Sequence, residues 1–308
     1  MINWILLYLK GVAMGSADVI PGVSGGTIAF ITGIYDRLLG AIAAVNVANL
    51  RLLLKGDFKG FFKAIDLTFL IVLFAGIGTA IVSLAKLITY LLKHHEVELW
   101  SFFFGLIIAS SILILKQVKK WNAVNFILLA IGVAIAYYLT SMGQSSMPDN
   151  LFGVFISGFI AIIAMILPGI SGSYILVMLG QYEKILGSIS GVLSGQLDLI
   201  PTLIVFAVGC VSGLLVFAKI LKWLLAHYHD AVVAALTGFM IGSLNKVWPW
   251  KNTLEYYTSS HGELKPLIQE NIVPAQMDSQ VMTAVALAIA GLALVLVLEY
   301  LGRRFQKA

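Results

Sequence analysis

The sequence has few charged residues, and this shortage excludes most soluble folds. Charged residues make up 11% of the 308-residue chain, whereas hydrophobic residues make up 60% and the mean hydropathy is +0.97. Soluble domains carry roughly a quarter charged residues, so this chain lacks the polar groups to cover a water-facing surface. Apolar runs long enough to cross a bilayer recur along its whole length. The composition therefore predicts a polytopic helical membrane protein.

Cysteine is nearly absent as well, and so are the usual signs of a cleaved leader, a metal site or a nucleic-acid partner. The one cysteine, Cys210, excludes an intrachain disulfide. The first apolar run contains Lys10 and Asp18 and has no small-residue cleavage site, so we expect it to stay in the mature chain. His94 and His227 fall at helix ends on opposite faces, too far apart to bind one metal ion. The net charge of +5 fits the basic loops that orient membrane helices, with membrane lipids rather than nucleic acid as partners.

Proline and glycine are concentrated at two points inside apolar stretches. Residues 21–26 read PGVSGG and residues 168–173 read PGISGS. When these two segments are aligned, nine of the twenty residues from each proline onward are identical. The sequence therefore predicts an internal duplication, with one unit at 1–145 and another at 150–308.

Basic residues set the orientation of the expected helices. Lys and Arg gather at 37–63, 116–120 and 303–307, whereas 141–150 has no basic residue. Because cytoplasmic loops carry the basic excess, we expect both termini and the 37–65 loop on the cytoplasmic side, and the 141–150 and 252–280 loops outside. The expected crossings are 66–92, 99–115 and 123–140 in the first unit, and 199–225, 231–247 and 281–301 in the second. Three crossings are an odd number, so the second unit is upside down relative to the first, an inverted-topology repeat.

The two proline-glycine breaks fall inside apolar helical pairs at 2–35 and 151–182. Proline removes a backbone donor and clashes with the preceding turn, so a helix must stop at Pro21 and at Pro168. In hydrocarbon such breaks survive only where they are buried in protein or line a wet cavity. We interpret each pair as a re-entrant hairpin; packing kinks in ordinary helices are the alternative. The expected fold class is an all-α polytopic membrane protein, whose inverted units each contain one re-entrant helical hairpin and three transmembrane helices.

The second arms of the hairpins are a candidate binding site. They begin at Ser24 and Ser171, whose hydroxyls can cap the new helices. Their free N–H groups and positive dipole ends would meet near the bilayer midplane and bind an anion, phosphate above all. Arg37 and Lys184 follow at matching positions and are candidates to collect a phosphate; interfacial anchoring is the alternative. The candidate substrate-binding residues are Gly22, Ser24, Gly25, Gly26, Thr27, Arg37, Gly169, Ser171, Gly172, Ser173 and Lys184.

One acidic residue lies close to the first break. Asp18 stands three residues before Pro21 in apolar surroundings, and Met165 takes its place in the second unit. A carboxylate inside a membrane is costly and usually functional. We interpret Asp18 as a candidate site for a coupling proton or sodium ion, and we expect no other cofactor. The alternative interpretation is that Asp18 only accepts hydrogen bonds from nearby backbone N–H groups.

The segments around the two breaks resemble a known family. GVAMGSADVIPGVSGGTIAFITGIYDRLL at 11–39, together with PGISGSYILVMLGQYEKIL at 168–186, is similar to the PopT family of bacterial undecaprenyl-phosphate translocases. The resemblance covers essentially the whole chain. It implies a flippase of the bacterial cytoplasmic (inner) membrane that returns undecaprenyl phosphate from the outer to the cytoplasmic leaflet, so that this carrier lipid is recycled for peptidoglycan synthesis. It assigns no role to single residues.

Two other functions fit part of the sequence. A secondary transporter or channel for a small soluble anion would also use half-helix N-termini, but its binding would not depend on a prenyl tail. Polyprenyl-pyrophosphate phosphatases carry a similar P-G-x-S-R-S-G motif, yet Gly25 and Gly172 occupy the Arg position here and no Glu-rich partner motif is present. Hydrolysis needs a cation and a nucleophile or base, so we expect a transporter without catalytic residues. The sequence leaves the oligomeric state open.

Overall fold

The long apolar runs form helices because a chain in hydrocarbon must satisfy its backbone hydrogen bonds within each segment. The computed structural model describes residues 4–19, 24–142, 147–258 and 264–307. The first half contains α1 (Trp4–Asp18), α2 (Gly25–Ile31), α3 (Tyr35–Ala43), α4 (Val47–Leu54), α5 (Phe58–Ala64), α6 (Leu67–His94), α7 (Glu96–Leu115) and α8 (Ala123–Ser141). The second half contains α9 (Leu151–Ile166), α10 (Gly172–Met178), α11 (Tyr182–Leu193), the short helix η1 (Leu197–Leu199), α12 (Ile200–His227), α13 (His229–Val247), the strands β1 (Lys251–Thr258) and β2 (Leu264–Asn271), and α14 (Ser279–Lys307).

Six helices of the described part of the chain are long and apolar enough to cross a membrane. They are α6, α7, α8, α12, α13 and α14. Each overlaps one of the six crossings expected from the sequence, three in each half. The expected fold class, an all-α polytopic membrane protein, is confirmed.

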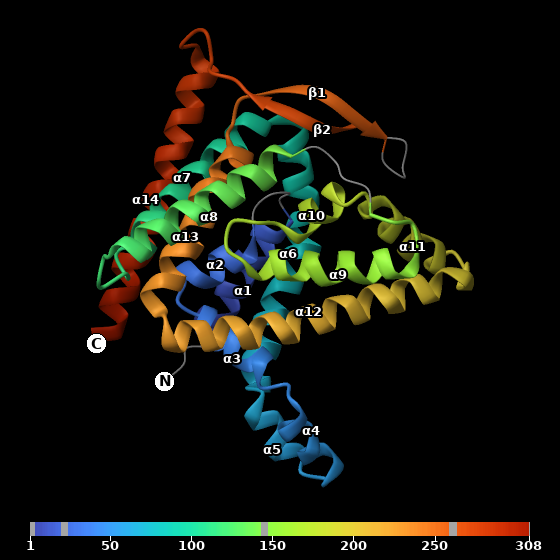
Figure 1. Ribbon diagram of the computed structural model, residues 1–308. Coiled ribbons are helices and arrows are strands. Elements are labelled where there is room, and N and C mark those ends of the chain that lie inside the picture. Colours follow the sequence, from blue (N-terminus) through green and yellow to red (C-terminus); the bar gives the residue numbers. More distant parts are fainter. Residues whose placement is uncertain (1–3, 20–23, 143–146, 259–263, 308) are drawn as a thin grey trace.

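The long helices pack in pairs, and the pairing follows one pattern in both halves of the chain. Within each half, a broken helix packs against the first long helix, α1 against α6 and α9 against α12. Between the halves, α7 packs against α14 and α8 against α13. In Figure 1 these last four helices gather on one side, while α9 and α12 run together across the molecule. The unit boundaries at 145 and 150 and the upside-down relation of the units stay predictions.

Glycines stand where the paired helices come closest. A Cβ atom at Gly238 of α13 would lie 3.0 Å from the Cα of Gly132 in α8. At the crossing of α1 and α6, a Cβ atom at Gly11 would lie 3.2 Å from the Cα of Gly76. Small residues let membrane helices approach closely, and the resulting van der Waals contacts hold the helices together where no water drives association.

Both expected breaks are present. α1 ends at Asp18 and α2 begins at Gly25, while α9 ends at Ile166 and α10 begins at Gly172. Pro21 lies outside the described residues, and Pro168 is buried. α2 and α3 meet at a bend of 116°, which fits either a broken span or a re-entrant segment. The re-entrant course of these segments through a membrane stays a prediction.

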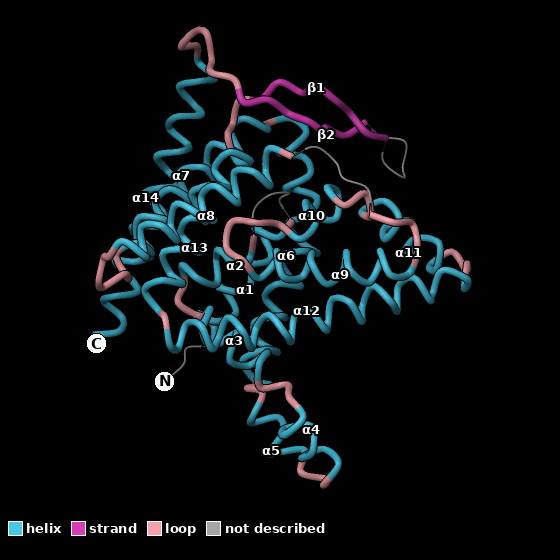
Figure 2. The backbone as a smooth tube through the Cα atoms, in the orientation of Figure 1, coloured by secondary structure: helices cyan, strands magenta, loops and turns pink. Residues whose placement is uncertain are grey.

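Two smaller features extend from the helical body at opposite ends, as Figures 1 and 2 show. The basic 37–65 loop contains the short helices α4 and α5. The loop expected outside, at 252–280, contains an antiparallel β-hairpin in which Lys251 faces Asn271 and Thr258 faces Leu264. This hairpin was not expected from the sequence.

Candidate functional site

The two proline-glycine breaks, far apart in the sequence, contact each other inside the molecule. The Ser24 hydroxyl donates a hydrogen bond to the backbone oxygen of Met165 at 2.9 Å. From the other side, the Gly169 N–H donates to the Thr27 hydroxyl oxygen, also at 2.9 Å. Ser24 and Thr27 are each 1% exposed. Because a buried polar group without a partner is costly, these two bonds fix the breaks against each other.

The close approach of the breaks requires glycine at two positions. A Cβ atom at Gly26 would lie 2.5 Å from the backbone oxygen of Ile166, and that oxygen also accepts a hydrogen bond from the Tyr35 hydroxyl at 3.0 Å. Gly169 has a φ of +92°, and a Cβ atom there would lie 2.9 Å from the Cα of Met240. A side chain at either position would push the breaks apart.

At the first break, groups of the protein already occupy the amides that begin α2. The Gly25 N–H donates to the Asp18 carboxylate at 2.7 Å, and the Gly26 N–H donates to the Ser24 hydroxyl oxygen at 3.1 Å. The Thr27 N–H donates to the Ser24 backbone oxygen at 3.0 Å. The capping role predicted for Ser24 is therefore confirmed. Asp18 makes the local backbone contact of the alternative interpretation, and its carboxylate stands where an anion would bind.

At the second break, the start of α10 differs. The expectation that the Ser171 hydroxyl caps α10 is wrong, because this hydroxyl pairs with the Ser173 hydroxyl at 2.8 Å instead. A Cβ atom at Gly172 would lie 2.6 Å from the backbone oxygen of Ala161, so α10 packs tightly on α9. Within the described chain, no group accepts a hydrogen bond from the N–H of Gly172 or of Ser173. This end of the site offers backbone and hydroxyl donors.

Arg37 and Lys184 are both paired with carboxylates of the protein. The Arg37 guanidinium forms two hydrogen bonds to the Asp66 carboxylate, at 2.6 and 3.1 Å, and lies 4.4 Å from the centre of the Phe69 ring. The Lys184 ammonium pairs with the Asp149 carboxylate. Each pair joins a short helix to the residue or loop that precedes another helix: α3 is joined to Asp66 before the long helix α6, and α11 to Asp149 before the shorter helix α9.

The structure thus separates the candidate residues into groups. Gly22 lies outside the described residues. Arg37 and Lys184 are paired with Asp66 and Asp149. The remaining candidates are at the contact or next to it in sequence: Ser24, Gly25, Gly26, Thr27, Gly169, Ser171, Gly172 and Ser173. A phosphate-binding role for any of them stays a prediction.

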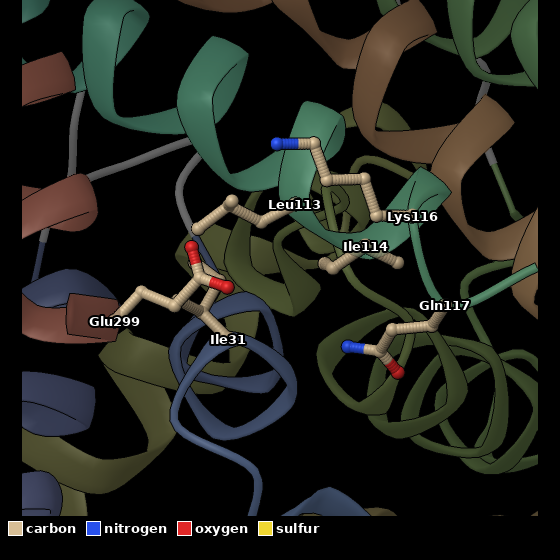
Figure 3. A pocket seen from close by; sticks show the side chains of 6 residues that line it. All are labelled: Ile31, Leu113, Ile114, Lys116, Gln117 and Glu299. Atoms are coloured by element: carbon tan, nitrogen blue, oxygen red, sulfur yellow. The ribbon is translucent and has the colours of Figure 1, made fainter. Parts of the chain in front are cut away.

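A cavity of about 230 Å³ opens at the far end of α2. Since α2 has 7 residues, it places this cavity about 10 Å from the break. Figure 3 shows the carboxylate of Glu299 and the amide of Gln117 on either side of Ile31. The lining residues are Ile31, Leu113, Ile114, Lys116, Gln117 and Glu299. This cavity could not be predicted from the sequence, because its walls come from the ends of α2 and α7 and from α14, which lie far apart along the chain.

Two lysines that the sequence did not single out, Lys246 and Lys251, lie near the second break and the start of α7. The Lys246 ammonium lies 4.8 Å from the centre of the Tyr174 ring, and Tyr174 directly follows Ser173 in α10. The Lys251 ammonium lies 4.9 Å from the centre of the Trp100 ring. In the sequence these lysines flank the aromatic stretch VWPW, and nothing there distinguishes them from lysines that anchor a helix at an interface.

Comparisons with known proteins agree with one another. A family model described as VCA0040-like, undecaprenyl phosphate translocase-like, matches residues 14–265. A polyprenyl-phosphate transporter of Vibrio cholerae is 47% identical over 303 residues, which cover 96% of each chain. A polyprenyl-phosphate transporter of Staphylococcus aureus is 34% identical over 259 residues, which cover 80% of this chain and 87% of the relative. No solved structure matches the chain.

Proposed function

The chain belongs to the undecaprenyl phosphate translocase-like family, and we propose from this that it is a membrane transporter of a polyprenyl phosphate. The proposed substrate is undecaprenyl phosphate, moved from the outer to the cytoplasmic leaflet of a bacterial inner membrane and so recycled for peptidoglycan synthesis. In this proposal both termini and the end with α4 and α5 are cytoplasmic, and the β-hairpin is outside. Basic residues near α4 and α5 support that orientation.

One observation carries the proposed mechanism, namely the contact between the two breaks. A lipid phosphate must leave water to cross a bilayer, so its charge needs donors in the interior of the protein. The amides of Gly172 and Ser173 and the hydroxyl pair of Ser171 and Ser173 are such donors, held against Thr27 through Gly169. Amides at helix starts favour phosphate. We place the headgroup here, and its exit at the cavity beside Ile31.

Asp18 has a defined place in this mechanism. Its carboxylate accepts the N–H of Gly25, so a phosphate that takes up this amide must displace it. A proton or sodium ion bound by Asp18 removes the repulsion between the carboxylate and the phosphate. We propose that ion binding at Asp18 and headgroup binding at the breaks occur together, which couples transport to an ion gradient.

The alternatives are less well supported. Gly25 and Gly172 occupy the Arg position of the phosphatase motif, so we propose a transporter rather than a hydrolase. A transporter of small soluble anions would also use donors at the breaks. Competition separates the two, because inorganic phosphate would then bind as tightly as a prenyl phosphate.

The deciding experiment is reconstitution of the full chain into liposomes with labelled undecaprenyl phosphate, following its movement between leaflets. We expect movement with the protein and little without it. Ser171→Ala should weaken headgroup binding about ten-fold or more, because a hydrogen bond to a charged group is worth roughly 1.5–3 kcal/mol. Ser24→Ala should also weaken binding, here indirectly, because the Ser24 hydroxyl holds the first break against Met165 of the second, and it should lower stability for the same reason.

A matched control is Ser188→Ala. The Ser188 hydroxyl is buried and donates only to its own helix, at the backbone oxygen of Lys184. This variant should bind like the wild type. Wild-type affinity in both Ser24→Ala and Ser171→Ala, with the fold intact, would place the phosphate site elsewhere. Absence of lipid movement in the wild type would refute the proposed function.

A further inference from the structure

Two lysines meet where the β-hairpin joins the helical body. Lys246 stands in the last turn of α13 and Lys251 begins β1. The Lys251 ammonium donates a hydrogen bond to the backbone oxygen of Lys246. Both side chains are half-buried. The chain therefore folds two like charges into one small space instead of spreading them over the surface.

The surroundings do not neutralise these charges. None of the ion pairs between described residues includes either lysine. Lys246 reaches the Gln269 side-chain oxygen only at 3.4 Å. Glu96, at the start of α7, is the acidic group that acts on both lysines, and its carboxylate accepts the Trp100 indole N–H at 3.3 Å. Two half-buried cations beside one exposed carboxylate leave room for a bound anion.

The position of the pair indicates which anion fits. Lys246 lies over Tyr174, which is one residue beyond Ser173 and so belongs to the first turn of α10. Lys246 therefore lies beside the helix turn that carries the donors of the second break, and Lys251 reaches this place through its hydrogen bond to Lys246. The Tyr174 ring is only half-buried and can contact an attached hydrocarbon chain, whereas the buried Trp100 ring supports the Lys251 ammonium from within the protein. A compact dianion on an apolar chain, a prenyl phosphate monoester, matches two ammonium groups flanked by aromatic rings.

We propose that Lys246 and Lys251 form a phosphate-monoester site that receives a prenyl phosphate headgroup on the β-hairpin face and passes it to the second break. The proposal rests on the proposed function, to which it adds an entry site. It gives the β-hairpin a role, because β1 carries Lys251 and β2 carries Gln269, and both reach α13.

This site has a characteristic pH dependence. Burial and the charge of Lys246 lower the pKa of Lys251 from 10.5 to about 7, against the opposing effect of Glu96, while Asn271 on β2 opposite Lys251 is uncharged. Lys251 is therefore protonated below about pH 7 and loses its charge above it. A phosphate monoester becomes a dianion above about pH 6. Affinity should be highest between these values and should fall on the alkaline side.

The test is calorimetric titration of the purified full-length chain with farnesyl phosphate, inorganic phosphate and farnesol. Near pH 6.5 we expect Lys251→Gln and Lys246→Gln each to weaken farnesyl phosphate binding about ten-fold or more. Lys251→Arg should bind like the wild type at this pH and should keep its affinity at pH 9, where the wild type loses it, because arginine stays charged. The matched control is Lys93→Gln, at an exposed lysine near the end of α6.

Several results would overturn the proposal. One is unchanged affinity in both glutamine variants; another is an alkaline loss in Lys251→Arg as large as in the wild type. Binding of inorganic phosphate as tight as farnesyl phosphate would refute a lipid-headgroup site. If the glutamine variants fail to fold, the affinities of Lys251→Arg and the wild type for farnesyl phosphate, compared across pH, still test the proposal.

The entry site and the proposed function can fail separately. In liposomes with labelled prenyl phosphate added to one side, the glutamine variants should slow movement only from the β-hairpin side. If the wild type moves lipid and the variants move it equally fast from both sides, the entry site is wrong and the transporter stands. If the lysines bind farnesyl phosphate and the wild type moves no lipid, the transport proposal fails alone.

Discussion

Asp18 shows how one residue of this chain holds a break in place. It ends α1, and its carboxylate reaches across the break to the first amide of α2 at 2.7 Å. A Cβ atom at Gly25 would lie 2.5 Å from that carboxylate, so glycine is needed for the contact. A carboxylate among apolar helices is costly, and here one hydrogen bond to backbone offsets only part of the cost. In our proposal Asp18 therefore also binds the coupling ion.

Asp18→Asn separates the charge of this residue from its hydrogen bond. Asparagine keeps an oxygen that can accept the Gly25 N–H, but it cannot hold a proton or a sodium ion. We expect the variant to fold and to bind farnesyl phosphate nearly as well as the wild type. Lipid movement in liposomes should lose its dependence on an imposed pH or sodium gradient.

The chain offers a matched control for this change. Asp57 caps α5 by accepting the Gly60 N–H at 2.8 Å, on an exposed loop. Asp57→Asn should leave gradient dependence unchanged. Should Asp18→Asn behave in the same way as this control, Asp18 would be only a backbone cap.

For single residues, the sequence predicted some local contacts and missed the long-range ones. The Ser24 cap follows from a serine before a glycine-rich helix start, and it is present. The same reasoning failed for Ser171, because Ser173 offers its hydroxyl a nearer partner. The aspartates that pair with Arg37 and Lys184 are 29 and 35 residues away, so only the tertiary fold could reveal them.

At the scale of elements, the ion pairs of Arg37 and Lys184 occupy matching positions, and each joins a short helix to the start of another helix. Arg37 holds α3 to Asp66 before α6, and Lys184 holds α11 to Asp149 before α9. All four side chains are partly or well exposed, and such pairs contribute about 0.2–1 kcal/mol. Pairs this weak can open, which is compatible with the proposed passage of a headgroup past these segments.

Neutral variants of these cations should therefore have one-sided effects. We expect Arg37→Gln to slow lipid capture chiefly from the cytoplasmic side and Lys184→Gln chiefly from the external side, each by about two- to five-fold given the weakness of the pairs. Initial rates in liposomes with label added to one side measure this. Equal slowing from both sides in both variants would argue against roles in capture.

Elements were predicted with unequal success. The six long helices follow from apolar runs of bilayer length, and the breaks follow from Pro-Gly. The β-hairpin could not be predicted in this way. Its strands, KNTLEYYT and LKPLIQEN, contain charged residues and a proline among few apolar residues, and they pair with register shifts. Its strands form where contacts with α13 support them, such as the Asn271 amide bonded to the Asn245 backbone oxygen at 2.9 Å.

At the scale of the molecule, the orientation predicted from basic loops awaits a direct test. In a Cys210→Ser background, Asp57→Cys near α5 and Glu270→Cys on β2 should react with a membrane-impermeant thiol reagent from opposite sides, because both residues are exposed. We expect Glu270→Cys to react in intact cells and Asp57→Cys only after the membrane is opened. A cysteine added at the C-terminus should behave like Asp57→Cys, and its reaction in intact cells would contradict the inverted repeat.

The crosswise pairing of α7 with α14 and of α8 with α13 has a consequence for how the protein is made. A ribosome that has completed α7 must still add the residues from 116 to 278 before α14 begins to emerge. At about 5–20 residues per second this takes on the order of 10–30 s. During that interval the face of α7 around Gly105, which packs on α14, has no permanent partner, and lipid or the insertion machinery must cover it. The first half therefore cannot mature as an independent unit, and assembly finishes only as the last helix enters the membrane.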